Sequence, residues 1–375
     1  MKVLLTGGIT GGHFYPIIAI TEELNKLAEE KHLVAFEVYF MSTDPYSERA
    51  LFENGITFIR VRTGKARQYF SLLNVVDFFK TIIAVFVALF KVFILFPDVV
   101  VGKGGSASFP ALFAARLLRI PVVIHESDST PGRVNKWAAK FAKKIAISYP
   151  EAAKYFPKEK VALTGNPIRN DIITPMKEGA YELLNLEKDI PIIFILGGSL
   201  GSKIINETIL QIVPELIEKY QIIHQVGKKN IKEVRDLTRV IIGEKEHKER
   251  YKVFEYLDDQ AMKMSAGVAD LVISRAGSTI FEIAVWGLPS IIIPISNSNG
   301  DHQRKNAYSY ARAGASDVIE EKNLTPHLLA SEINRLMNDK QKRDEMSRAA
   351  KEFSKVDAAK KIAEQIMGIL IKHEN

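Results

Sequence analysis

The chain has 375 residues, of which 47% are apolar and 25% are charged, a composition typical of a soluble globular protein. Because a single core rarely grows beyond about 250–300 residues, this length predicts two domains. The absence of cysteine excludes disulfides, thiolate catalysis and cysteine-ligated metal centres. A formal net charge of +7 favours an anionic partner such as a phosphorylated substrate, a membrane surface or nucleic acid. The N-terminus enters a strand directly and shows no signal-peptide pattern.

Strand-like and helix-like segments alternate along the whole chain, which is typical of α/β proteins with parallel sheets. In the first half we predict strands at Lys2–Leu5, Val38–Met41, Thr57–Arg60, Asp98–Val101, Val122–His125 and Ile145–Ser148. In the second half we predict strands at Ile192–Leu196, Ile222–Gln225, Lys252–Glu255, Leu271–Ser274, Ser290–Pro294 and Asp317–Ile319. The pattern predicts two doubly wound, Rossmann-like domains with parallel sheets that face each other across a cleft.

A turn-rich stretch, Thr164-Gly165-Asn166-Pro167, marks the boundary between the halves and is followed by a charged segment. We predict a first domain over residues 1–165, a linker over 166–189 and a second domain over 190–354. Residues 355–375 have a helical pattern, and we expect them to pack back on the first domain.

Two glycine-rich turns occupy corresponding places in the two halves. They are Thr6-Gly7-Gly8-Ile9-Thr10-Gly11-Gly12-His13 and Leu196-Gly197-Gly198-Ser199-Leu200-Gly201-Ser202, each between a strand and a helix. The first turn matches neither the NTPase phosphate loop nor the dinucleotide fingerprint. The helix N-terminus after each turn favours a phosphate, a carboxylate or a developing anion. His13 opens its helix, where a neutral imidazole could accept a proton; a capping or packing histidine is the alternative.

Further polar groups follow other strands, at the edge where open α/β sheets bind ligands. In the first half they are Gly102-Lys103-Gly104-Gly105-Ser106 and His125-Glu126-Ser127-Asp128. In the second half, Ser274-Arg275-Ala276-Gly277-Ser278-Thr279 leads to Glu282, and Asn299-Gly300-Asp301-His302-Gln303 follows the next strand. Glu282 could accept both hydroxyls of a ribose, or it is an ordinary first-turn glutamate. The chain contains no D-x-D, so a metal-chelated nucleotide diphosphate is not indicated.

The segment from Phe70 to Phe96 is strongly apolar, with Asp77, Lys80 and Lys91 as its charges. Its longest charge-free run, Thr81–Phe90, is shorter than the roughly 20 residues of a membrane span. Two interpretations stay open: a core helix packed on the sheet, or a helix with excess apolar surface for lipid contact. Nearby basic residues favour lipid contact with an anionic leaflet.

Taken in order, these motifs resemble the bacterial UDP-N-acetylglucosamine:lipid I N-acetylglucosaminyltransferases, the MurG family of GT-B enzymes of peptidoglycan synthesis. The resemblance runs from the first strand to about Ala315. It is carried by the first glycine-rich turn with Pro16, Gly102–Gly105, His125-Glu126 with Pro131-Gly132 and Asn135-Lys136-Trp137, Thr164–Arg169, Gly197–Gly201, Ser274–Gly277, and His302-Gln303 with Asn306-Ala307.

The resemblance implies an inverting transfer of N-acetylglucosamine from UDP-GlcNAc to the 4-hydroxyl of the muramyl sugar of undecaprenyl-pyrophosphoryl-MurNAc-pentapeptide (lipid I). The product would be lipid II, a precursor in cell wall biogenesis that serves cell shape and division. His13 is the implied general base, with Glu126 as the other candidate. The implied UDP-GlcNAc contacts are Thr10, Gly11, Gly12, Asp128, Arg169, Ser199, Leu257, Gly277, Ser278, Thr279, Glu282 and Gln303. The implied acceptor contacts are Gly104, Gly105 and Ser106.

The resemblance also implies a peripheral enzyme on the cytoplasmic face of the bacterial plasma membrane. The implied membrane contacts are Phe79, Ile82, Ile83, Phe86, Trp137 and Lys140. We expect no metal, no cofactor and no nucleic acid partner. The expected partners are an anionic membrane surface and other cell-wall synthesis proteins. Two departures from the family pattern are an extra residue, Ile9, and an aspartate, Asp128, where an asparagine is usual.

Three alternatives stay open from the sequence. The chain could be a different GT-B glycosyltransferase with a lipid acceptor, or a UDP-GlcNAc 2-epimerase. It could also be a non-catalytic subunit that binds a sugar nucleotide or docks on a membrane. The apolar segment disfavours the epimerase, which needs no lipid surface.

Overall fold

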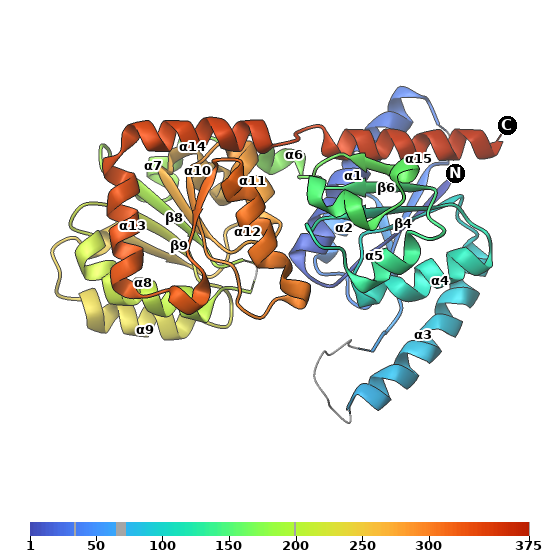
Figure 1. The fold of residues 1–375 in the computed structure, drawn as a ribbon, viewed down its shortest axis with the longest axis horizontal. Coiled ribbons are helices and arrows are strands. Elements are labelled where there is room, and N and C mark those ends of the chain that lie inside the picture. The colour runs from blue at the N-terminus through green and yellow to red at the C-terminus, as the bar shows by residue number, and fades with distance from the viewer. Residues whose placement is uncertain (34, 65–72, 199, 375) are drawn as a thin grey trace. The chain divides into compact units, whose positions relative to one another are not determined.

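The computed structural model describes residues 1–33, 35–64, 73–198 and 200–374 (Figure 1). These residues form two compact units. The first contains residues 1–169 and 355–375, and the second contains residues 170–354.

The first unit is built on a parallel sheet with the strand order β3-β2-β1-β4-β5-β6-β7. Its strands are β1 (Lys2–Thr6), β2 (Glu37–Ser42), β3 (Ile56–Arg60), β4 (Val99–Gly102), β5 (Val122–Glu126), β6 (Lys144–Ile147) and β7 (Val161–Leu163). The predicted strands of this half are all present, with ends within one residue. The prediction missed β7, a three-residue strand at the sheet edge with two exposed residues.

Helices cover both faces of this sheet. They are α1 (Gly11–Glu30), α2 (Glu48–Glu53), α3 (Leu73–Leu95), α4 (Phe109–Leu117), α5 (Arg133–Ala138) and α15 (Ala358–Glu374), with 3₁₀ turns at Ser106–Ser108, Pro150–Tyr155 and Lys158–Lys160. Successive residues of a strand pack on opposite faces of the sheet. Leu5 packs with α1 and α15 on one face, whereas Leu4 packs with α3 and α4 on the other. Because both faces are covered, the strands read as nearly continuous apolar runs.

The second unit repeats this plan with the strand order β10-β9-β8-β11-β12-β13, again all parallel. Its strands are β8 (Ile192–Leu196), β9 (Gln221–Gln225), β10 (Tyr251–Phe254), β11 (Leu271–Ser274), β12 (Ser290–Ile292) and β13 (Ser316–Val318). Its helices are α6 (Asn170–Ile173), α7 (Ala180–Leu183), α8 (Lys203–Leu216), α9 (Ile231–Ile242), α10 (Asp259–Val268), α11 (Thr279–Trp286), α12 (His302–Arg312), α13 (Pro326–Asn338) and α14 (Lys340–Phe353). The 3₁₀ turns are Lys248–Arg250, Asn299–Asp301 and Glu321–Asn323.

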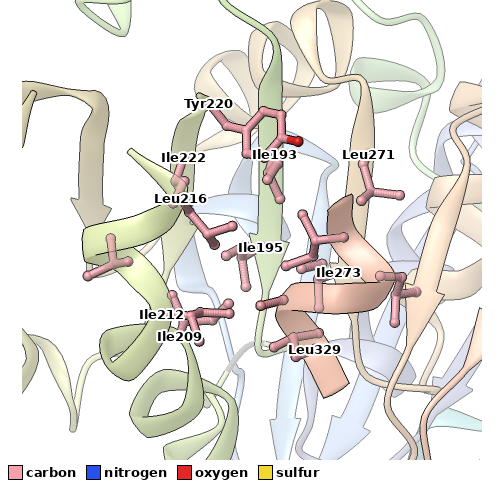
Figure 2. Packing of buried hydrophobic residues seen from close by; sticks show 14 of the residues in the cluster. Ile193, Ile195, Ile209, Ile212, Leu216, Tyr220, Ile222, Leu271, Ile273 and Leu329 are labelled. Carbon is pink, nitrogen blue, oxygen red and sulfur yellow. The ribbon is translucent and has the colours of Figure 1, made fainter. Parts of the chain in front are cut away.

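Strand β8 shows how the second core is filled. Figure 2 shows its Ile193 and Ile195 packed among residues of α8, β11 and α13, such as Ile209, Ile273 and Leu329. The intervening residues of β8, Phe194 among them, join the opposite cluster with α10 and α11. This alternation confirms the predicted α/β class with two Rossmann-like domains.

The predicted linker over 166–189 is corrected by the structure, because residues 170–189 belong to the second unit. The Trp286 indole N–H donates to the carbonyl of Ile172 over 2.7 Å, and the Met176 N–H donates to the carbonyl of Lys263 over 3.0 Å. Ala180 and Leu184 are buried in the second core. The charged composition of residues 170–189 gave no sign of these hydrogen bonds or of the few apolar side chains that the segment buries.

Candidate functional site

In the first unit, three turns meet at the carboxyl ends of β1, β4 and β5, which are neighbours in the sheet. The Lys103 N–H donates to the Thr6 carbonyl over 2.8 Å, which ties the turn after β4 to β1. A Cβ on Gly105 would lie 3.0 Å from Gly8 Cα and 3.7 Å from His13 Nε2. Glycines therefore let the two turns and the imidazole approach one another.

His13 lies half-buried in the first turn of α1. Its Nδ1 is 2.9 Å from the hydroxyl oxygen of Thr10, the residue before the helix. A Cβ on Gly8 would come within 3.0 Å of this Nδ1, so the glycine provides room for the ring. The exposed Thr10 thus orients an imidazole that solvent or a ligand can reach.

Glu126, the last residue of β5, is 4% exposed and uses both carboxylate oxygens. Oε1 accepts the Asp128 N–H over 2.9 Å, and Oε2 accepts the Gly132 N–H over 3.1 Å and the Asn135 side-chain amide over 2.9 Å. Burial and the charge of Asp128 raise the pKa of Glu126 to about 7, against the opposing effect of its hydrogen bonds and of Lys103. Glu126 therefore titrates near neutrality and organises the turn that follows its strand.

His125, the residue before it, is fully buried and donates from Nε2 to the Gly165 carbonyl over 3.0 Å. Ser148 Oγ lies 3.2 Å from the same nitrogen. Burial, together with the charge of Lys103, holds the pKa of His125 well below its usual range. A neutral His125 links β5 to the turn after β7.

The ammonium of Lys103 is also buried, with the residue 3% exposed. Its Nζ donates to Asn166 Oδ1 over 3.4 Å. Burial lowers the pKa of Lys103 to about 8, and the charges of Glu126 and Asp128 act in the opposite direction. The sequence prediction placed this turn at the site but gave no role to Lys103, because a lysine is ordinarily exposed.

The remaining predicted residues of this unit surround the same edge. Arg169 is buried, and its guanidinium carbon lies 3.6 Å from the centroid of the Tyr15 ring on α1, a cation–π contact. Asp128 is half-buried, Gly104 is buried, and Ser106 is exposed at the start of a 3₁₀ turn.

In the second unit, the glycine-rich turn lies between β8 and α8. Gly198 and Gly201 have φ of +83° and +74°, and a Cβ on Gly201 would lie 1.9 Å from the Val226 carbonyl oxygen. Backbone conformation and crowding therefore both require glycine at 201. Ser199, predicted to bind the donor diphosphate, lies outside the described residues.

A buried arginine supports this turn and was not predicted as a site residue. Arg275, after β11, donates to Ser202 Oγ over 2.6 Å and to the Ile293 carbonyl over 3.1 Å. It also pairs with Glu321 Oε2 at 2.5 Å. Burial lowers the pKa of Arg275, and Glu321 opposes that effect. These contacts join the start of α8 to β11, β12 and the turn after β13.

The other predicted donor residues follow β10, β11 and β12. The Leu257 N–H donates to Gln225 Oε1 over 2.9 Å, and the same glutamine amide lies 3.5 Å from the Gly198 carbonyl. Gln303 Oε1 accepts the Ile295 N–H over 3.1 Å. Gly277 and Ser278 lie just before α11, and Thr279 and Glu282 lie in its first turn; all four are half-buried. Apart from Ser199, the structure thus brings the predicted residues of this unit to one sheet edge.

Helix α3 lies beside α4 at the rim of the first unit (Figure 1). It buries its small residues, Ala84 and Ala88, and exposes its large apolar ones: Phe79 is 59%, Ile83 is 62% and Phe86 is 67% exposed. By length and composition, Val75–Leu95 is the one helix in the described part of the chain that could cross a membrane. A core helix would bury the large side chains instead.

An aromatic cluster lies next to α3, on α4 and around α5. Trp137 contacts the rings of Phe109, Phe113 and Phe141, and the Arg116 guanidinium carbon lies 5.2 Å from the centroid of the Phe141 ring. Trp137 is half-buried in this cluster, whereas Lys140 is exposed. Among the described residues, no cluster of three acidic or histidine side chains could hold a metal ion.

Comparisons with known proteins agree with this geometry. Residues 3–147 match the glycosyltransferase family 28 N-terminal domain, and residues 192–362 match the glycosyltransferase family 28 C-terminal domain. A Bacillus cereus protein named UDP-N-acetylglucosamine--N-acetylmuramyl-(pentapeptide) pyrophosphoryl-undecaprenol N-acetylglucosamine transferase 2 is 37% identical, over 97% of this chain and 99% of its own. A Clostridium novyi protein of the same name, without the final number, is 38% identical over 91% and 92%.

Solved structures with the same fold include a MurG and an epimerase. The crystal structure of Acinetobacter baumannii MurG matches with a TM-score of 0.72 at 27% identity, covering 98% of this chain and 99% of that one. A Listeria monocytogenes structure described as a putative UDP-N-acetylglucosamine 2-epimerase matches with a TM-score of 0.70 at 17% identity, covering 97% and 95%. At that identity the second match shows the fold alone.

Proposed function

Because the chain belongs to the family of UDP-N-acetylglucosamine--N-acetylmuramyl-(pentapeptide) pyrophosphoryl-undecaprenol N-acetylglucosamine transferases, we propose that it converts lipid I to lipid II. The muramyl 4-hydroxyl attacks the anomeric carbon of UDP-GlcNAc, the glycosidic C–O bond forms, and UDP leaves with the bonding electron pair. The hydroxyl proton goes to a general base. The observation that supports this proposal most strongly is the 37% sequence identity to a named relative over 97% of this chain.

The second unit is proposed to bind the donor. The turn around Gly198 and the N-terminus of α8 offer N–H groups to the diphosphate. Glu282, in the first turn of α11, accepts the two ribose hydroxyls, and Gln303, in the first turn of α12, contacts the sugar. Leu257 contributes its carbonyl toward uracil, since its N–H already binds Gln225. Ser199 and the half-buried turn Gly277, Ser278 and Thr279 complete this proposed set.

The first unit is proposed to bind the acceptor at Gly104, Gly105 and Ser106, and to supply the general base. His13 fits this role better than Glu126, because His13 is half-buried while both oxygens of Glu126 accept hydrogen bonds. Glu126 instead holds the turn that carries Asp128. The predicted donor contacts of this unit, Thr10, Gly11, Gly12, Asp128 and Arg169, stay part of the proposal.

Helix α3 is proposed to lie on the cytoplasmic leaflet of the plasma membrane. Its exposed row of Phe79, Ile82, Ile83 and Phe86 provides contiguous apolar area, and Lys140 adds a cation for anionic headgroups. Trp137 belongs to the neighbouring aromatic cluster. Such peripheral attachment would bring the enzyme to its undecaprenyl-linked acceptor and to other cell-wall synthesis proteins.

Release of UDP from UDP-GlcNAc in detergent, with and without a lipid I analogue, tests the proposed activity. We expect release that depends on the acceptor, because the muramyl hydroxyl is the nucleophile. Release without acceptor, or conversion of the sugar to its epimer, would contradict the transferase and favour the epimerase alternative.

Replacement of the proposed base gives a second prediction. We expect His13→Ala to lower kcat by about 10²–10⁴-fold with nearly unchanged donor affinity, because the hydroxyl then loses its proton acceptor. A wild-type rate for His13→Ala, together with a kcat loss of this size for Glu126→Gln at unchanged KM, would assign the base to Glu126.

Glu282→Ala tests the donor site. We expect UDP-GlcNAc to bind about ten-fold more weakly or worse in calorimetry, because hydrogen bonds to a charged group contribute about 1.5–3 kcal/mol. Glu244→Ala, at an exposed position of the same unit, is the matched control and should bind as the wild type does. Equal donor affinity in both variants would place the nucleotide elsewhere.

Phe86→Glu tests the membrane surface by sedimentation with phosphatidylglycerol vesicles. We expect binding to fall about ten-fold or more, because burying a phenylalanine contributes about 1.5–3 kcal/mol. Phe52→Glu is the control, since Phe52 is 87% exposed on α2 of the same unit and outside α3. Wild-type vesicle binding by a folded Phe86→Glu variant would remove α3 from the contact surface.

A further inference from the structure

Glu321, in the second unit, makes contacts with both of its carboxylate oxygens, although it is not among the proposed donor contacts. It follows β13, at the start of a 3₁₀ turn, and its side chain is 19% exposed. Oε2 pairs with the Arg275 guanidinium at 2.5 Å, and Oε1 accepts the Ser296 N–H over 3.3 Å. The carboxylate therefore joins a buried arginine to the exposed loop that follows β12.

Arg275 extends this contact to the turn that is proposed to hold the donor diphosphate. Its guanidinium donates to Ser202 Oγ over 2.6 Å, from the same nitrogen that pairs with Glu321, and to the Ile293 carbonyl over 3.1 Å. Ser202 is the residue before α8. These four residues follow β8, β11, β12 and β13, which are neighbours in the sheet. One line of contacts thus crosses the carboxyl edge of the second sheet.

The loop after β12 leads to Gln303, the proposed sugar contact. The Ile295 N–H donates to Gln303 Oε1 over 3.1 Å, and the Gln303 N–H donates to Ser298 Oγ over 3.1 Å. Because the amide oxygen faces the backbone of this loop, the NH₂ group is the part of the side chain that can donate to a sugar hydroxyl. The orientation of Gln303 therefore depends on the backbone of Ile295 and Ser296, which Glu321 holds through the Ser296 N–H.

Stability alone does not explain an ion pair at this place. Replacing a buried ion pair with apolar side chains of similar volume is often neutral or stabilising, because desolvation offsets the attraction between the charges. What an apolar pair could not provide is the set of directed bonds that Arg275 and Glu321 make to two separate turns.

We propose that Glu321 is a positioning residue for the sugar donor, because it joins the turn at Ser202 to the loop that carries Gln303. The diphosphate and the sugar of one donor molecule are then held by parts of the chain that are already fixed relative to each other. Such preorganisation lowers the entropy lost when the ligand binds. This inference rests on the proposed function, since it takes UDP-GlcNAc as the ligand and Gln303 as the sugar contact.

The test compares the binding of UDP and of UDP-GlcNAc to the full chain by calorimetry. We expect Glu321→Ala to weaken UDP-GlcNAc binding by about three-fold or more beyond its effect on UDP, because one hydrogen bond typically contributes a factor of about 2–10. A side chain that only stabilises the fold would weaken the binding of both ligands by the same factor. An unchanged ratio of the two affinities in Glu321→Ala would overturn the proposal.

A double-mutant cycle with Gln303→Ala locates the effect. Once the Gln303 side chain is removed, Glu321→Ala should add less than about two-fold to the sugar-specific loss, because both changes act on the same contact. Additive losses would show that Glu321 acts on another part of the donor and would contradict the proposal. Unchanged UDP-GlcNAc binding in Gln303→Ala alone would overturn both the proposal and the sugar contact on which it rests.

Glu321→Ala leaves the Arg275 charge buried without its partner, so a second variant keeps the test decisive if this one does not fold. Arg275→Met combined with Glu321→Met removes the whole ion pair without leaving a single buried charge. We expect this double variant to fold and to show the same sugar-specific loss, because the Ser296 N–H again loses its acceptor.

The matched control is Arg250→Met combined with Glu187→Met. Arg250 and Glu187 form another ion pair of the same unit, at 3.0 Å, and they precede β10 and β8 instead of following strands. This control should keep the wild-type ratio of the two affinities, and an equal change of that ratio in both double variants would overturn the proposal. If the wild type binds UDP-GlcNAc but transfers no sugar to lipid I, the proposed function fails, while the binding cycle still decides the role of Glu321.

Discussion

Burial of both faces of each parallel sheet is the constraint on which the rest of this structure depends. Because helices cover the faces, polar groups that need a ligand, a partner or water collect at the carboxyl edge of the strands. In the first unit this edge carries His13, Lys103 and Glu126, and in the second it carries the turn at Gly198, Arg275 and Glu282. Each edge holds a buried cation, Lys103 in the first unit and Arg275, which pairs with the half-buried Glu321, in the second.

Helix α3 departs from that plan, because its small residues face the protein while its phenylalanines face outward. Such an arrangement lowers the solubility of a free protein and fits an interface with lipid. An acceptor with an undecaprenyl chain stays in a membrane, so an enzyme that uses it benefits from a surface of this kind. The same unit therefore carries both the proposed acceptor turn and the proposed attachment surface.

The strands and their turns could be predicted because buried parallel strands are short apolar runs followed by glycine and polar residues. Strand β7 was missed, since three partly exposed residues at a sheet edge carry no such pattern. The roles of Lys103 and Arg275 could not be predicted, because their burial depends on packing between elements distant in the sequence. For α3, the sequence left two interpretations open, since which face packs is decided by α4 and the sheet rather than by composition.

The configuration of the sugar linkage in the product tests the central claim most directly. Lipid I would be incubated with ¹³C-labelled UDP-GlcNAc and the purified chain, and the product analysed by mass spectrometry and NMR. The account predicts one added N-acetylglucosamine on the muramyl 4-oxygen, with the anomeric coupling of a β-linkage, because the α-linked donor is inverted. An α-linkage, free N-acetylglucosamine or an epimerised sugar nucleotide would contradict it.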